Sequence, residues 1–240
     1  MTKPDVFQKE EHMLVLQNVN KQYSSITAAN NQNISLEAGN VYALLGPNGS
    51  GKSTFMKMIT GLVKPDSGTI LYKGQPLSSQ SKLDISYMPT ESYFYSYMTA
   101  KDICKYFSDF FPDFNPNKFY AFLNDMELPD YLKAYKMSTG MLAKLKIAVS
   151  LSRNSGLMML DEPLNGIDII SRERMTATIK ANSGPGRIMI VSSHLVDELE
   201  TVSTHAIFIK QGSIVAAGSI EELRNQTGLG LVDIYKRIYA

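Results

Sequence analysis

The segment GPNGSGKS at residues 46–53 contains the residue types that hold phosphate groups. It matches the pattern G-x-x-x-x-G-K-[ST], follows an expected strand and precedes an expected helix. Glycines let backbone N–H groups turn toward phosphate oxygens, and the helix N-terminus adds partial positive charge. We therefore expect Lys52 to reach the β- and γ-phosphates of a nucleoside triphosphate and the Ser53 hydroxyl to bind Mg²⁺. The predicted nucleotide-binding residues of this segment are Gly46, Pro47, Asn48, Gly49, Ser50, Gly51, Lys52, Ser53 and Thr54.

Two adjacent acids stand at the end of a second apolar run, LMMLD at residues 157–161. A carboxylate at the end of a strand beside the phosphate loop suits Mg²⁺, so we assign Asp161 to the metal. Side chains alternate along a strand, so Glu162 is expected to point elsewhere and to act as the general base for an attacking water. The alternative is a pair of solvated loop acids. His194 ends another apolar run and is expected at the ligand-binding edge of the sheet, with a structural role as its alternative.

Short apolar runs that alternate with helical ones would position these residues. Strands are expected at residues 13–19, 34–38, 41–46, 69–74, 84–89, 157–161, 187–193 and 206–210. Several are continuously apolar, which is typical of strands buried on both faces of a mostly parallel sheet. Residues 92–122 instead hold about half of the Tyr and Phe residues, which indicates a separate helical subdomain of about 85–155. We predict an α/β fold with a P-loop NTPase core and a mostly parallel sheet, an N-terminal antiparallel β subdomain and an inserted α-helical subdomain.

The composition is that of an ordinary globular chain. The 240 residues are 44% hydrophobic and 20% charged, with a formal net charge of +1, which argues against general nucleic-acid binding. The single cysteine, Cys104, cannot form an internal disulfide, so we expect a reducing compartment. No window approaches the ~18 apolar residues of a membrane span, and residues 1–12 lack the apolar core of a signal peptide.

From about Met13 to Gly218 the motifs resemble those of the ATP-binding cassette (ABC) ATPases, so we expect residues 1–240 to be one cassette domain. In that family two cassettes pack head to tail, and each supplies an LSGGQ-like signature to the ATP held by the other. The segment MSTGM at residues 137–141 occupies the signature position. The resemblance implies that Ser138 and Gly140 cap the γ-phosphate across a dimer interface, although Thr139 and Met141 depart from the family pattern. A helix N-cap without a further role is the alternative.

Other positions are assigned by the same resemblance. Tyr23 stands where the family stacks an aromatic ring on adenine, and NGID, which ends at Asp168, matches the loop that communicates across the dimer. His194 matches the histidine that contacts the γ-phosphate. Thr90, followed by Glu91, stands where the family usually has a glutamine that touches Mg²⁺ and the membrane partner. Either side chain offers an oxygen to the metal, so both are candidate ligands.

The resemblance implies a subunit that binds ATP and Mg²⁺, hydrolyses ATP with Glu162, His194 and Lys52, and powers transport, with export favoured. The expected partners are a transmembrane permease subunit on a separate chain and a second ABC ATPase subunit, in a homodimer or heterodimer. The expected location is the cytoplasmic side of the cell membrane. Residues 92–114 are a candidate docking segment for the membrane subunit, or else part of the core of their own subdomain.

The alternative function is that of a soluble cassette ATPase acting on nucleic acid or ribosomes. Such proteins, by resemblance, carry two cassettes or long coiled-coil insertions in one chain. This sequence has one phosphate loop and no sustained heptads, and its charge is nearly balanced. We therefore expect no nucleic-acid partner.

Overall fold

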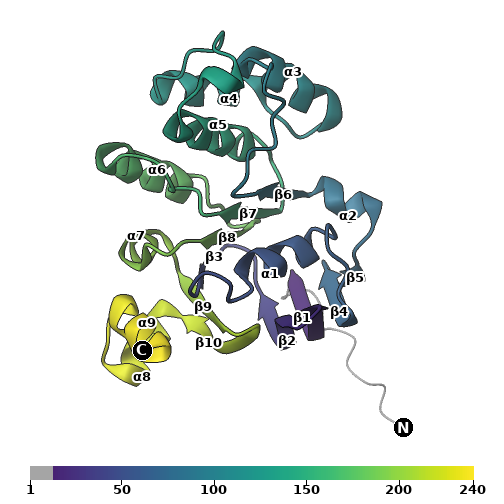
Figure 1. The fold of residues 1–240 in the computed structure, drawn as a ribbon, viewed down its shortest axis with the longest axis vertical. Coiled ribbons are helices and arrows are strands. Elements are labelled where there is room, and N and C mark those ends of the chain that lie inside the picture. The colour runs from purple at the N-terminus through teal and green to yellow at the C-terminus, as the bar shows by residue number, and fades with distance from the viewer. Residues whose placement is uncertain (1–12) are drawn as a thin grey trace.

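A six-stranded sheet forms the centre of the computed structural model, which describes residues 13–240 (Figure 1). Its strands, in spatial order, are β10 (Ser213–Ser219), β9 (His205–Lys210), β3 (Val41–Leu45), β8 (Ile188–Ser192), β7 (Leu157–Asp161) and β6 (Ile85–Met88). Neighbouring strands pair in parallel except β9 and β10. Every residue of β3, β7 and β8 is buried, which explains their continuously apolar sequences. Residues 1–12, where we expect no signal peptide, lie outside the described residues.

A second, antiparallel sheet has the order β2 (Ile26–Leu36), β1 (Leu14–Tyr23), β4 (Ser67–Tyr72) and β5 (Gln75–Pro76). Helix α1 (Lys52–Ile59) packs between the two sheets, where Phe55 shares one hydrophobic cluster with Leu14 and Ile190. β2 begins at Ile26 rather than at residue 34. The polar residues NNQN at 30–33 interrupt the apolar pattern, and backbone pairing with β1 continues the strand across them to Ile26.

The helical subdomain follows β6 and lies at the top of Figure 1. It contains α3 (Ala100–Phe110), α4 (Pro116–Asp125) and α5 (Thr139–Leu151). Thr99 begins α3 with a capping box to Asp102, and Asn115 caps α4 ahead of a proline in its first turn. Phe114 and Phe119, whose ring centroids are 5.8 Å apart, lie in its core, so part of the aromatic segment builds the subdomain itself.

The remaining helices are α2 (Ser79–Leu83), α6 (Ile169–Ala181), α7 (Val196–Val202), α8 (Ile220–Thr227) and α9 (Leu231–Tyr239). Side chains of α6 to α9 share a second hydrophobic cluster with alternate residues of β3, on the face opposite α1. Among residues 13–240, no helix combines the length and the hydropathy that a membrane crossing requires.

The predicted fold is confirmed: a mostly parallel α/β core carries an antiparallel β subdomain and an inserted helical subdomain. Because β3, β6, β7 and β8 are parallel, their carboxyl ends meet at one edge of the sheet. The phosphate loop, Thr90, the acid pair and His194 each follow one of these strands, so the topology gathers them at that edge.

Candidate active site

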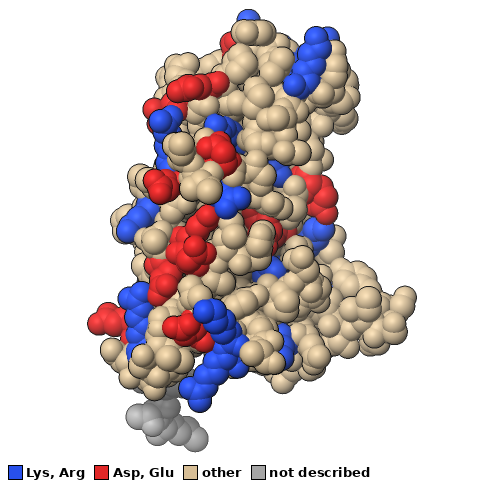
Figure 2. Space-filling model, turned by 60° about the vertical axis from the view of Figure 1, so that its left-hand side comes forward, with Lys and Arg blue, Asp and Glu red and all other residues tan. Residues whose placement is uncertain are grey.

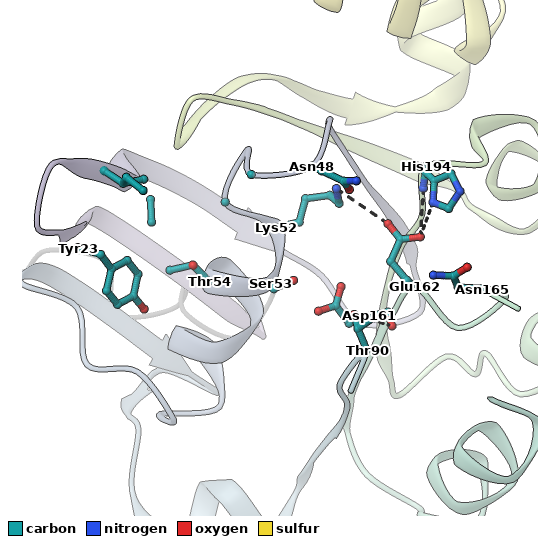
Figure 3. Close-up of a pocket in the computed structure, with 14 residues that line it drawn as sticks. Tyr23, Asn48, Lys52, Ser53, Thr54, Thr90, Asp161, Glu162, Asn165 and His194 are labelled. Carbon is teal, nitrogen blue, oxygen red and sulfur yellow. Dashed lines mark hydrogen bonds and ion pairs between the residues drawn. The ribbon is translucent and has the colours of Figure 1, made fainter. Parts of the chain in front are cut away.

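A cavity of about 480 Å³ lies at this edge of the sheet (Figure 3). Its walls come from the β1–β2 hairpin, the loop between β3 and α1, and the segments after β6, β7 and β8. The residues that line it are Tyr23, Ile26, Ala28, Asn48, Gly49, Gly51, Lys52, Ser53, Thr54, Thr90, Asp161, Glu162, Asn165 and His194. Ile26 and Ala28 were not predicted as site residues, because only the pairing of β2 with β1 brings them beside the loop.

Glycines allow the phosphate loop to pass close to neighbouring backbone. At Gly46, with φ of 157°, an added Cβ would lie 2.5 Å from the carbonyl oxygen of Ile209. At Gly51, with φ of 112°, it would overlap the carbonyl oxygen of Ala28. Helix α1 begins at the next residue, so its N-terminal backbone N–H groups lie at the cavity. Gly46, Pro47 and Ser50 belong to the loop but do not line the cavity.

The buried ammonium of Lys52 lies inside the loop and beside the acid pair. Its Nζ donates to the carbonyl oxygens of Gly46, at 2.7 Å, and Pro47, at 3.3 Å, and lies 4.0 Å from Oε1 of Glu162. Burial lowers the pKa of Lys52 from its usual value, and the carboxylates of Glu162 and Asp161 oppose that shift. The loop therefore holds a positive charge at the cavity wall through hydrogen bonds to its own backbone.

Asp161 is buried, with 1% of its surface exposed, and is held by two hydroxyl groups. Ser192 donates to Oδ1 at 2.6 Å, and Tyr87 donates to Oδ2 at 3.3 Å. The Ser192 hydroxyl also accepts a 3.0 Å hydrogen bond from the backbone N–H of Glu162. Sequence reasoning missed Ser192 and Tyr87, since only the parallel pairing of β6, β7 and β8 brings them to the acids.

Glu162 lines the same cavity as Asp161, but its carboxylate points in a different direction and has different partners, although strand alternation is not the reason (Figure 3). β7 ends at Asp161, and Glu162 lies beyond it with φ of 51°, in the left-handed region that non-glycine residues rarely adopt. Its Oε2 lies 2.8 Å from Nδ1 of His194 and accepts a 3.3 Å hydrogen bond from the His194 backbone N–H. The carboxylate thus lies between the His194 imidazole and the Lys52 ammonium (Figure 3).

The structure separates the two candidate ligands after β6. Thr90 lines the cavity, and its hydroxyl donates to the backbone carbonyl of Asp161 at 3.5 Å. The Glu91 side chain is 73% exposed, does not line the cavity, and lies 3.9 Å from Nζ of Lys57. A metal in the cavity could therefore bind the Thr90 hydroxyl oxygen, whereas the Glu91 carboxylate lies outside the cavity.

Ser138, Gly140 and Asp168 do not line the cavity of their own chain. Ser138 caps α5 and Asp168 caps α6, each accepting a hydrogen bond from a backbone N–H of its own helix. An added Cβ at Gly140 would lie 2.9 Å from the carbonyl oxygen of Gly166. The first turn of α5 therefore packs against the loop that precedes α6. Ser138, Gly140 and Asp168 thus lie at the starts of α5 and α6, outside the cavity.

The donors in the cavity fit Mg²⁺ accompanied by phosphate. Ser53, Thr90 and Asp161 present oxygen atoms, the ligand type that Mg²⁺ prefers. In the described part of the chain, no group of three or more His, Cys, Asp and Glu residues can hold a metal by itself. That composition suits an ion that takes its remaining ligands from phosphate and water.

A residue far along the chain supports the loop from behind. The Tyr239 hydroxyl, near the end of α9, lies 3.1 Å from the carbonyl oxygen of Leu45 and 2.9 Å from that of Ile209, and donates to both. Leu45 directly precedes the phosphate loop, and the Ile209 carbonyl is the group that Gly46 approaches. No sequence motif marked this contact.

The sheet, the glycine loop and the acid pair define a P-loop NTPase. The family described as ABC transporter matches residues 29–165, which is more than half of the chain. The lantibiotic transport ATP-binding protein SrtF of Streptococcus pyogenes is 34% identical over 221 residues, covering 89% of this chain and 96% of SrtF. The chain therefore belongs to the ABC transporter family and is an ATP-binding ATPase subunit of that family.

Solved structures agree on the fold. An ATP-binding subunit of an ABC transporter superposes with a TM-score of 0.86 at 21% identity, covering 95% of this chain and all of that one. A dimeric ATP-binding cassette bound to ADP and Pi superposes with a TM-score of 0.77 at 22% identity, covering 86% of this chain and 98% of that one.

Ser192→Ala removes the shortest hydrogen bond to the buried Asp161 carboxylate. We expect it to lower the free energy of unfolding by about 1–3 kcal/mol and to reduce kcat for ATP, because both acids lose a common support. Urea denaturation and steady-state ATPase assays measure the two effects. The matched control is Ser193→Ala, since Ser193 is also buried but its hydroxyl accepts a hydrogen bond from the backbone N–H of Leu195 and not from the acid pair. Equal kcat in the two variants would contradict the assignment.

Proposed function

We propose that this chain hydrolyses Mg·ATP between two cassettes to power transport, in the direction of export, through a membrane subunit on a separate polypeptide. The observation that carries the proposal is the single cavity that holds the phosphate loop, Asp161, Glu162 and His194. SrtF is a lantibiotic transport ATP-binding protein, and its likeness to almost the whole chain supports transport as the work that ATP drives.

The cavity suggests one orientation for the nucleotide. The Tyr23 side chain lies at one end, so adenine would stack there, and the phosphates would extend to the loop and the N-terminus of α1 (Figure 3). Lys52 would then exchange its bonds to loop carbonyls for phosphate oxygens. Ser53, Asp161 and Thr90 would hold Mg²⁺, which supplies charge neutralisation at the phosphates.

Glu162 is the proposed general base. Its carboxylate is fixed at the cavity wall by His194 on one side and faces Lys52 on the other, so it is oriented before water arrives. His194 and Lys52 would stabilise the charge that develops on the transferred phosphoryl group. The left-handed backbone at Glu162 supports this role, since such strain is concentrated at functional sites.

A second cassette would complete the site. Ser138 and Gly140 begin α5 outside their own cavity, and a helix N-terminus is a favourable place for an anion. We propose that these residues, with Asp168 beside them, meet the γ-phosphate held by the partner cassette. The partner is either a second copy of this chain or a different cassette.

Lys52→Ala should weaken ATP affinity at least ~10-fold, because a charge-assisted contact to phosphate is lost. Titration with a fluorescent ATP analogue measures this effect. Lys57→Ala is the matched control on the same helix, since Lys57 does not line the cavity. Wild-type affinity in Lys52→Ala would overturn the phosphate-loop assignment.

Glu162→Gln should keep ATP binding but lower turnover at least ~100-fold, because the amide cannot accept the proton of water. Light scattering with Mg·ATP should then show a trapped dimer. Glu173→Gln, a change to an exposed acid of α6, is expected to behave as wild type. Retained hydrolysis in Glu162→Gln would place the base elsewhere. A monomer that still binds ATP would rule out closure of two copies on each other and point to a different second cassette.

An apolar groove beside the helical subdomain is the proposed docking site for the membrane subunit. Two adjoining cavities, of about 360 and 310 Å³, share the side chains of Tyr87, Tyr93, Phe107 and Phe111. Leu62, at the rim of the first cavity, is 69% exposed although it is apolar. Aromatic residues are enriched at the cores of protein interfaces, which supports a partner at this groove.

Leu62→Asp should reduce the fraction of the chain that sediments with membranes, because a charge at the groove rim opposes burial. The purified variant should keep its ATPase activity, since Leu62 is exposed and outside the nucleotide cavity. Tyr131→Asp changes another exposed apolar residue away from the groove and serves as the control. Equal membrane fractions for both variants would exclude this groove as the docking site.

Nucleic acid remains the less favoured partner. On the face shown in Figure 2, acidic and basic side chains are intermixed, without a continuous basic track. Binding to a phosphate backbone requires clustered Lys and Arg. With a formal net charge of +1, the chain is better suited to a protein partner.

A further inference from the structure

A buried lysine in the middle of α5 connects the helical subdomain to the nucleotide cavity. Lys146 is 7% exposed, and its neighbours on the helix, Leu145 and Ile147, are fully buried. Its Nζ donates to the carbonyl oxygens of Pro89, at 3.1 Å, and Thr90, at 2.7 Å. These carbonyls belong to the segment after β6, so the contact joins two elements that are far apart in the sequence.

The segment that Lys146 holds is part of the cavity wall. The Thr90 side chain lines the cavity, and its hydroxyl donates to the backbone carbonyl of Asp161. Burial lowers the pKa of Lys146, and the negative charges of Glu91 and Asp161 oppose that shift. The ammonium is therefore linked to the acid end of β7 by hydrogen bonds through Thr90 and also by charge.

Packing alone does not explain a lysine at this position. Replacing a buried charged group by an apolar side chain of similar size is often neutral or stabilising. Burying an ammonium is costly unless acceptors meet its donors, and two of the three N–H donors of Lys146 meet backbone carbonyls of another segment. The same helix begins at Ser138, the residue proposed to meet the partner's ATP.

We propose that Lys146 is a positioning residue that ties α5 to the Pro89–Thr90 segment, so that the placement of the helical subdomain sets the placement of Thr90 in the nucleotide cavity. If α5 moved relative to this segment, two charge-assisted hydrogen bonds would break. Closure of a second cassette on Ser138 would then be transmitted to the metal side of the site in the same chain. The inference rests on the hydrolytic site proposed above.

The test compares Lys146→Met and Lys146→Arg with the wild type in the full chain. Lys146→Met keeps the length of the side chain and removes its donors, whereas Lys146→Arg keeps charge and donors. The matched control is Lys105→Met, the same change on the exposed face of α3. The measurements are ATP affinity without Mg²⁺, kcat, KM for Mg·ATP and the Mg²⁺ concentration that gives half-maximal turnover.

We expect Lys146→Met to bind ATP with wild-type affinity, since the phosphate loop is untouched. Its kcat should fall at least ~10-fold and its half-maximal Mg²⁺ concentration should rise, because Thr90 is no longer held in place. Lys146→Arg should restore part of the kcat and of the Mg²⁺ response. Lys105→Met should behave as wild type in all four measurements.

Two results would overturn the inference. The first is wild-type kcat and Mg²⁺ dependence in Lys146→Met. The second is a parallel loss of ATP affinity, kcat and thermal stability that Lys146→Arg does not relieve, which would make Lys146 a purely structural residue. If Lys146→Met does not fold, Lys146→Gln decides instead, because it removes the charge and shortens the reach of the donor. A raised half-maximal Mg²⁺ concentration with unchanged ATP affinity supports the inference, and a wild-type Mg²⁺ response overturns it. Failure of the hydrolytic site itself is recognised separately, by continued turnover in Glu162→Gln.

Discussion

The active site depends on one buried carboxylate and the strand pairing that satisfies it. The hydroxyls of Ser192 and Tyr87 supply the side-chain hydrogen bonds that a carboxylate in the protein interior requires. Both hydroxyls reach it because β6, β7 and β8 pair in parallel in one register, with Asp161 opposite Ser192. The same register places Glu162 next to His194 and brings both to the phosphate loop after β3. A shift of β7 against β8 would therefore misplace several functional groups at once.

The helical subdomain is connected to this site by polar contacts as well as by the chain. Its first residues follow Thr90, and its last helix returns to the carbonyls of Pro89 and Thr90 through Lys146. The apolar groove lies between the subdomain and the central sheet, since Ile85 of β6 and Phe111 at the end of α3 both line it. A partner in that groove would thus lie close to the segment that bears Thr90. This arrangement gives an ABC ATPase a short physical route between a partner and its own nucleotide cavity.

The motifs that sequence reasoning recognised are short and local. The glycine loop, the acid pair at the end of LMMLD and the histidine after an apolar strand each have their own strand-and-turn context. Their place at the sheet edge followed from the parallel topology. Errors arose where the conformation is not local. Alternation along β7 was the wrong reason for the separate direction of Glu162, since the strand ends before it and the backbone turns left-handed. The first half of β2 was missed because the polar residues NNQN at 30–33 interrupt the apolar pattern, and only pairing with β1 carries the strand across them to Ile26.

The sequence by itself determined the family, the α/β class and the phosphate-binding chemistry, because the phosphate loop is a local motif and the other motifs and apolar runs follow it in a recognisable order along the chain. Only the tertiary structure decided that Thr90 and not Glu91 faces the cavity, and that Ser192, Tyr239 and Lys146 support the site. These three side chains act on backbone or carboxylate oxygens from distant parts of the chain. Hydrogen bonds require contact within about 3 Å, and no local pattern specifies which distant groups will meet.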